Sequence, residues 1–152
     1  MSIMNALNIS ASGMTAQRLR LDIISQNIAN VSTTRDENGE VYRRKTVVFA
    51  EMQSDSASSF SRMLTNRTSG LSEVSGSGVK VTSIVEDHVT AMNKVYDPSH
   101  PDADEEGYVT YPNVNTVTEM TNLIDATRSY EANVTAFNAT KNMLLKGLEV
   151  GQ

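Results

Sequence analysis

The stretch YPNVNTVTEMTNLIDATRSYEANVTAFNATKNMLLKGLEV, residues 111–150, decides how the chain folds. Pro112 and the Asn/Thr cluster that follows it, Asn113, Asn115 and Thr116, are typical of a helix start. Apolar residues then recur at helical spacing in two neighbouring rows, with Thr127 and Lys141 as polar interruptions. The first row holds Leu123, Tyr130, Phe137 and Leu144, and the second holds Met120, Val134 and Leu148. This pattern predicts a helix over 116–148 with a coiled-coil-like seam.

Such a helix would be about 50 Å long, so it needs a second long helix to cover its apolar stripe. The N-terminal residues supply one, with apolar residues seven apart and Ile24 on the adjacent row. The row holds Leu7, Met14, Leu21 and Ile28. We predict a helix over 3–29, ended by Asn30 in a left-handed conformation. The expected fold is α+β, with the two long terminal helices antiparallel and a small, mainly β middle region.

The composition limits the possible functions. The chain has 152 residues, 5% of them aromatic, and no tryptophan, which favours helices that bury one stripe over a single compact core. It has no cysteine, which excludes disulfides, thiolate metal sites and a cysteine nucleophile. The net charge of −5 argues against nucleic acid as a partner.

The charge is unevenly distributed. Residues 1–30 and 116–152 carry five basic and five acidic side chains, whereas 31–115 carry eight basic and 13 acidic ones. Neutral ends can pack together in number, while an acidic middle is better left in solvent. No apolar run approaches the ~20 residues of a membrane span, so we expect no membrane-spanning helix. The N-terminus lacks the pattern of a secretory signal peptide.

The middle region reads as short strands and loops. Residues 40–52 and 108–111 each predict a strand, and 79–96 predict one or two. Residues 36–39, with Asn38-Gly39, predict a turn. The Ser/Gly-rich stretch 53–78 is predicted to be a flexible insertion whose residues 53–77 tolerate deletion. All three prolines lie in 98–112, which predicts an extended, stiff connector.

No catalytic, cofactor or metal site is predicted from the residues. Residues 102–106 match the start of a calcium loop, but Asn113 stands at the twelfth position, where a glutamate is needed, and no helix precedes the loop. His88 and His100 share no helical register, and nothing resembles a nucleophile elbow. Gly76-Ser77-Gly78 precedes a strand, so it does not predict a phosphate loop.

Four segments carry a family resemblance: ASGMTAQRLRLDIISQNIANVST (11–33), YRRKTVVF (42–49), YDPSHPDADEEGYVTYPNVN (96–115), and EM with RSYEANV (119–134). They resemble the axial proteins of the bacterial flagellar rod and hook. The first contains the signature shared by these subunits, and the third is similar to the proximal-rod type. The matching motif residues are Asn27, Asn30, Asp97, Pro98, Gly107, Tyr108, Pro112, Asn113, Asn115, Glu131 and Asn133.

The resemblance implies a structural rod subunit without catalysis or cofactors. Residues 1–34 and 112–152 would form an inner, tube-lining helical domain, and 35–111 an outer layer. Expected partners are copies of itself, other rod proteins and the rod–MS-ring adapter protein. The protein would lie in the flagellar basal body outside the cytoplasmic membrane, after export by the flagellar type III apparatus.

Two other hypotheses remain at this stage. One is another type III-secreted helical assembly protein, of the needle or translocator kind. The other is a calcium-binding adhesive module. Because each helix has only a narrow apolar stripe, we also predict that both helices become ordered only on assembly.

Overall fold

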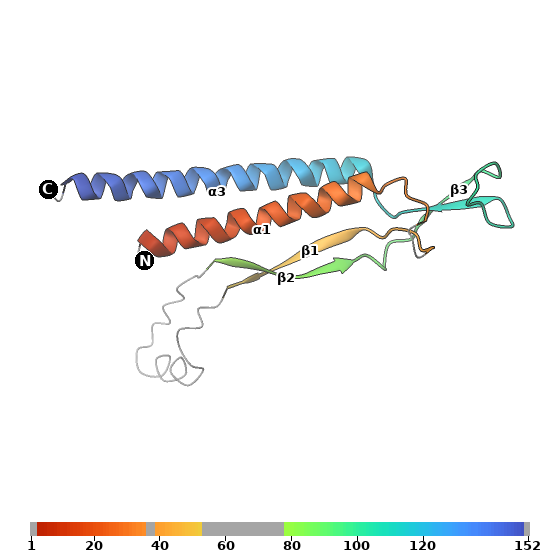
Figure 1. Cartoon of the computed structure of the whole chain (residues 1–152), viewed down its shortest axis with the longest axis horizontal. Coiled ribbons are helices and arrows are strands. Elements are labelled where there is room, and N and C mark those ends of the chain that lie inside the picture. The colour runs from red at the N-terminus through yellow and green to blue at the C-terminus, as the bar shows by residue number, and fades with distance from the viewer. Residues whose placement is uncertain (1–2, 36–38, 53–77, 151–152) are drawn as a thin grey trace, which may run out of the picture.

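The fold of the chain was taken from a computed structural model, which describes residues 3–35, 39–52 and 78–150. Two long helices, α1 (Ile3–Ala29) and α3 (Thr116–Val150), lie side by side and run antiparallel (Figure 1). This confirms the predicted α+β fold and the start of both helices, and α3 extends two residues beyond the predicted 148. The predicted turn at 36–39, apart from Gly39, and the insertion at 53–78, apart from Gly78, lie outside the described residues.

The two helices meet the rest of the chain through asparagine side chains. The Asn115 side-chain oxygen accepts hydrogen bonds from the Val117 N–H (3.0 Å) and the Thr118 N–H (3.2 Å), so Asn115 is the N-cap of α3. Asn30 does not adopt the predicted left-handed conformation, because glycines are the only described residues with positive φ. Instead, Asn30 accepts hydrogen bonds from the Thr33 N–H and hydroxyl, which hold a turn after α1.

Two close contacts define the register of the helix pair. Asn27 bonds to Glu119, and Gly13 faces the Asn133 side chain, whose oxygen would lie 2.8 Å from a Cβ atom at Gly13. The two pairs are equally spaced along both helices, as an antiparallel pair requires. By the same spacing Ile3 lies opposite Met143, so the last turns of α3 extend past the start of α1 (Figure 1).

The hairpin of β1 (Lys45–Glu51) and β2 (Val79–Glu86) is antiparallel, with a bulge between Val48 and Phe49. It packs on the side of α1 away from α3 (Figure 1). Two side chains of α1 fix it: Asn27 bonds to both backbone groups of Lys45, and the Ser12 hydroxyl accepts the Val79 N–H at 3.0 Å. The predicted strand at 40–52 begins only at Lys45, because the Arg44 N–H is taken by the Asn113 side chain.

A second hairpin, β3 (Asn93–Tyr96) and β4 (Tyr108–Tyr111), projects past the end of α1 (Figure 1). The prediction of an extended connector was therefore wrong for 97–107, which fold back as a series of turns. Asp104 accepts the Glu106 and Tyr108 N–H groups, and Gly107 has a φ of +83° with the Tyr96 ring beside it. These turn contacts outweigh the stiffness of Pro98 and Pro101.

The core is thin for a chain of this length. Among the described residues, the buried apolar side chains are those of Ala16, Ile23, Ile24, Val109, Pro112, Val114 and Ala126. Most residues of the predicted rows are half-buried, including Leu7, Met14, Leu21, Ile28, Leu123, Tyr130, Val134, Phe137 and Leu144. Met120 and Leu148, by contrast, are 53% and 63% exposed. The buried helix residues include the small Ala16 and Ala126, whereas the large residues of the rows remain partly open.

Replacing Gly13 by alanine should have little net effect on stability. A helical alanine gains about 1 kcal/mol over glycine, but its Cβ would displace the Asn133 side chain. In an Asn133→Ala background the same substitution should stabilise by the full amount, measured as the free energy of unfolding in urea. Gly147→Ala is the control, since nothing lies within 4 Å of its Cβ position. Equal gains at Gly13 in both backgrounds would show that the helices do not approach closely there.

Candidate functional site at the junction of helices and hairpin

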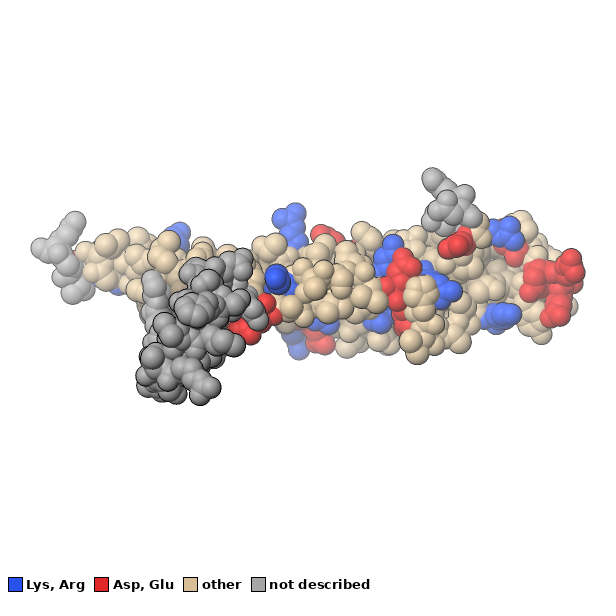
Figure 2. Space-filling model, turned by 90° about the horizontal axis from the view of Figure 1, so that it is seen from below, with Lys and Arg blue, Asp and Glu red and all other residues tan. Residues whose placement is uncertain are grey.

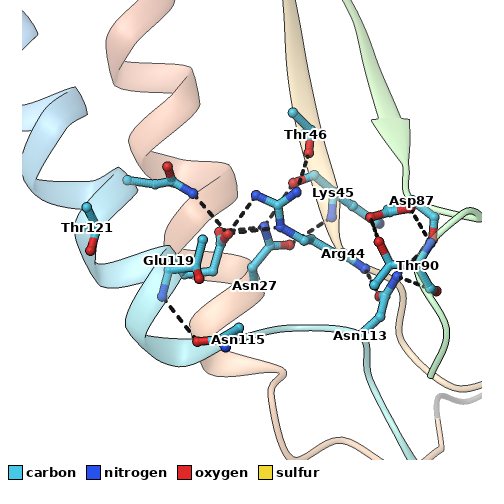
Figure 3. Close-up of polar contacts among 12 residues, drawn as sticks. Asn27, Arg44, Lys45, Thr46, Asp87, Thr90, Asn113, Asn115, Glu119 and Thr121 are labelled. Atoms are coloured by element: carbon cyan, nitrogen blue, oxygen red, sulfur yellow. Dashed lines mark hydrogen bonds and ion pairs between the residues drawn. The ribbon is translucent and has the colours of Figure 1, made fainter. Parts of the chain in front are cut away.

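A buried polar cluster lies where α1 ends, α3 begins and β1 starts (Figure 3). We call Asn27, Tyr42, Arg44, Asn113 and Glu119 the polar junction. At its centre is Glu119, whose side chain is fully buried. Its Oε1 accepts hydrogen bonds from Arg44 Nε (2.9 Å) and Nη2 (2.8 Å), and its Oε2 accepts one from Asn27 Nδ2 (3.0 Å).

The position of Glu119 in the helix also favours its charge. It lies in the first turn of α3, where the unpaired N–H groups give the helix end a partial positive charge. Asn122, one turn later, donates a further hydrogen bond to Oε1 at 3.2 Å. The carboxylate is thus held by an ion pair, two amide groups and the helix end, which together offset its removal from water.

Asn27 satisfies all of its hydrogen-bonding groups within the chain. Its side-chain nitrogen donates to the Lys45 carbonyl at 2.9 Å and to Glu119, and its side-chain oxygen accepts from the Lys45 N–H and the Tyr42 hydroxyl, both at 2.9 Å. It therefore pairs with the edge of β1 as a neighbouring strand would. A single amide joins α1, β1 and α3, and a shorter or longer side chain could not make all four bonds.

Asn113 joins the other side of the junction. Its side-chain oxygen accepts the Arg44 N–H at 2.9 Å, and its nitrogen donates to the carbonyls of Asp87 (3.0 Å) and Thr90 (3.3 Å). The pKa of Asp87 is lowered by hydrogen bonds from the Thr90 N–H and hydroxyl and from the Val89 N–H. These bonds shape the turn that follows β2, so Asn113 ties the approach to α3 to both strands of the hairpin.

The polar junction holds the two helices and the β1–β2 hairpin together. Every polar group in it pairs with another part of the chain, which leaves none aimed at a substrate. Within 3–35, 39–52 and 78–150, no group of three or more acidic or histidine side chains could hold a metal ion. Asp102, in the calcium-loop hypothesis, bonds instead to the Thr34 hydroxyl (2.7 Å) and pairs with Arg35 (3.3 Å). The helices of the described chain are also too polar to cross a membrane.

The comparisons with known proteins agree with this architecture. Residues 7–35 match the family model "Flagella basal body rod protein", and residues 105–150 match "Flagellar basal body rod FlgEFG protein C-terminal". The chain is 53% identical to a flagellar basal-body rod protein FlgC from Bacillus subtilis, over all of both chains. It is 41% identical to the FlgC of Borreliella burgdorferi, over 100% of this chain and 99% of that one. The FlgC of Salmonella typhimurium is 38% identical over all of both.

The chain belongs to the FlgC family of flagellar basal-body rod proteins. It is accordingly a structural subunit of the rod, located in the flagellar basal body. The comparisons give no support to the needle, translocator or calcium-dependent adhesin hypotheses. The two family matches include α1 from residue 7 onward and the whole of α3, and Asn27 and Glu119 of the polar junction join these two segments.

The FlgC motif residues fall into three places. Asn27 and Asn113 belong to the polar junction, and Pro112, next to Asn113, is also buried. Asp97, Pro98, Gly107 and Tyr108 lie at the tip of the β3–β4 hairpin, where the Asp97 N–H donates to the Gly107 carbonyl at 2.9 Å. On the helices, Asn115 caps α3, Asn133 faces Gly13, Asn30 holds the turn after α1 and Glu131 is exposed.

Sequence reasoning missed the centre of the junction. Glu119, Arg44 and Tyr42 lie in the segments that resemble the rod proteins, but no local sequence pattern assigns them a role. The same holds for Ala126, which is fully buried. The available signal was a carboxylate in the first turn of a helix that otherwise carries an apolar seam, together with alanines at helical spacing.

Alkaline pH should weaken the polar junction through Tyr42. Burial, and then the negative charges of Glu86 and Glu119, raise the pKa of Tyr42 above its ordinary 10.0. The unfolded chain loses the Tyr42 proton at a lower pH than the folded chain does. The contribution of protonated Tyr42 to the free energy of unfolding is therefore complete below about pH 10 and is lost as the pH rises through the raised pKa. In the Tyr42→Phe variant the urea midpoint of unfolding should fall less with rising alkaline pH than it does in the wild type. The Tyr130→Phe variant should show the same fall as the wild type. Parallel curves for both variants would contradict this role.

Proposed function

We propose that this rod subunit uses α1 and α3 as the inner, tube-lining layer of a helical assembly, with residues 35–111 as the outer layer. The supporting observation is the set of large apolar side chains that α3 leaves open to solvent. Val117 is 74% exposed and Met143 is 64% exposed, and Leu145 and Leu148 near the helix end are also exposed. Exposed apolar side chains that gather on one helix of a subunit are typical of contacts with other copies.

The half-buried rows support the same arrangement. Each of four row residues is only half-buried in the single subunit and leaves one side open to contacts with other chains: Leu21, Ile28, Leu123 and Phe137. In an assembled tube each helix would gain further neighbours on that side. We assign the packing residues of both rows, including Met120 and Leu148, to contacts between subunits as well as within one. The division into a helical domain, 1–34 with 112–152, and a middle domain follows from this.

The rest of the assignment concerns how the rod is built. The subunit has no catalytic role; it transmits torque through its helix contacts and encloses the export channel. It is exported unfolded by the flagellar type III apparatus, for which a chain without cysteine is well suited. Its partners are copies of itself, other rod proteins and the rod–MS-ring adapter protein.

Charged substitutions on the outer face of α3 test the proposal. Leu148→Asp should leave the circular dichroism of the purified chain unchanged, because Leu148 is largely exposed in the single subunit. It should abolish the rod in a strain that lacks the wild-type gene, seen by electron microscopy of isolated basal bodies. Asn142→Asp, an exposed polar neighbour, is the matched control. Normal rods with Leu148→Asp would remove this face of α3 from the subunit contacts.

A further inference from the structure

A groove of about 270 Å³ opens where β1 faces α1 and the first turns of α3. Its apolar lining residues are Ile23, Ile24, Val47 and Phe49. Arg20, Thr46 and Asn122 line it with polar groups. No residue of β2 contributes, so the groove lies along the outer edge of β1.

That edge offers backbone groups that no other strand of the described chain takes up. The Asp87 N–H donates to the Arg44 carbonyl, and hydrogen-bonded pairs alternate along an antiparallel ladder, so the N–H and C=O of Lys45 and Val47 point away from β2. Asn27 takes those of Lys45. Beyond the bulge, the Met52 N–H donates to the Gly78 carbonyl, which places the Phe49 groups outward as well. Val47 and Phe49 therefore present two N–H donors beside the groove.

The groove also carries an uncompensated positive charge. Arg44 is neutralised by Glu119, and Lys45 pairs with Glu86 at 3.7 Å. The Arg20 side chain makes no hydrogen bond or ion pair with any other residue that the structure describes. A free guanidinium next to two backbone N–H donors is a receptor for carboxylates.

The matching ligand lies on the same chain, at the tip of the β3–β4 hairpin beyond the end of α1 (Figure 1). Acidic side chains gather at the tip of the β3–β4 hairpin (Figure 2). Asp102 and Asp104 are engaged locally, by Arg35 and by the N–H groups of the turn. The carboxylates of Glu105 and Glu106 are exposed and make no hydrogen bond or ion pair within the described residues. Because the tip projects away from the helices along the long axis, it cannot turn back into its own groove (Figure 1).

We propose that the groove beside β1 receives the 102–106 tip of a second copy of this chain, with Glu105 and Glu106 meeting Arg20 and the free N–H groups of β1. The contact joins two different surfaces, so it repeats from copy to copy without closing on itself, as a helical rod requires. It rests on the proposed assembly of the chain into a rod and adds to it a defined contact in the middle region.

Charge exchange tests the contact in a strain that lacks the wild-type gene. Arg20→Glu, and separately Glu105→Arg with Glu106→Arg, should each lower the number of complete rods recovered about tenfold. The three substitutions together should restore most of that loss. Arg18→Glu, two residues away and outside the groove, is the control and should be near wild type. The proposal would be overturned if the triple variant is exported normally but gives no more complete rods than Arg20→Glu alone or the double glutamate variant alone.

Cross-linking gives an independent answer, because the chain has no cysteine of its own. Copies with Thr46→Cys and copies with Glu105→Cys, expressed together, should give a disulfide-linked dimer in isolated basal bodies. Lys80→Cys, on the other strand of the hairpin, should not. Intact rods without the Thr46–Glu105 link, or with Glu105 linked to a different rod protein, would overturn the proposal. Rods that form in the complete absence of this chain would instead contradict its function as a rod subunit.

Discussion

Glu119→Ala should lower the free energy of unfolding by about 3 kcal/mol, the range found when one partner of a buried ion pair is removed. The substitution leaves the Arg44 guanidinium, which is 27% exposed, without its carboxylate, and it removes an acceptor from Asn27. Few apolar side chains are buried elsewhere, so little remains to hold α1 against α3. We expect a largely unfolded chain and no rods.

Urea unfolding followed by circular dichroism measures the effect. Glu131→Ala, an exposed carboxylate on the same helix, should change the free energy of unfolding by less than about 0.5 kcal/mol. The loss of unfolding free energy in Glu119→Gln should lie between those of Glu119→Ala and Glu131→Ala, because the glutamine NH₂ group would face the donating nitrogen of Asn27 or the guanidinium of Arg44. Glu119→Leu combined with Arg44→Met should be more stable than Glu119→Ala, since no buried charge is left unpaired. Equal losses for Glu119 and Glu131 would show that the polar junction contributes nothing to stability.

The helices could be predicted from the sequence because their signals are local. The apolar rows and the Asn115 cap each lie within one helix or next to it, and both predicted starts agree with the structure. The polar junction could not be predicted in this way. Asn27 and Glu119 are 92 residues apart, and Arg44 and Glu119 are 75 apart. A carboxylate in the first turn of a helix is favourable whether it faces water or a distant arginine, so this signal marks Glu119 as a residue to consider but does not identify its partner.

The prediction for the β3–β4 hairpin was wrong for a different reason. Proline content alone suggested an extended connector, since proline fixes φ and lacks an N–H group. However, Pro98 and Pro101 occupy turn positions, where these properties are compatible with a reversal of the chain. The hairpin is formed by what surrounds them: the Asp97 and Asp104 side chains accept turn N–H groups, and the rings of Tyr96 and Tyr108 meet edge to face with centroids 5.3 Å apart.

The position of the polar junction changes what we expect of the free subunit. Most buried side chains of the described residues lie within a few residues of it, among them Ile24, Asn27, Val114 and Glu119, whereas Ser10, Ala16 and Ala126 lie farther along the helices. At the opposite end of the helix pair, Ile3, Met4 and Met143 are exposed. Ordering a residue costs about 1–2 kcal/mol of backbone entropy, and only the junction half has the buried contacts to offset that cost. The prediction that both helices become ordered only on assembly should therefore hold for their far halves alone.

Amide hydrogen exchange of the purified subunit should show this as a gradient along each helix. We expect slow exchange near 20–29 and 117–127, and rapid exchange over 3–12 and 134–148, where few contacts are buried. In assembled rods the far halves should become protected, because neighbouring copies then cover their apolar rows. Phe137→Asp, in the far half, should abolish rod assembly while barely changing the circular dichroism of the monomer. Leu21→Asp, beside the junction, should instead unfold the monomer. Uniform protection along both helices of the monomer, with a cooperative melt that Phe137→Asp shifts strongly, would mean that a complete helical hairpin forms before assembly.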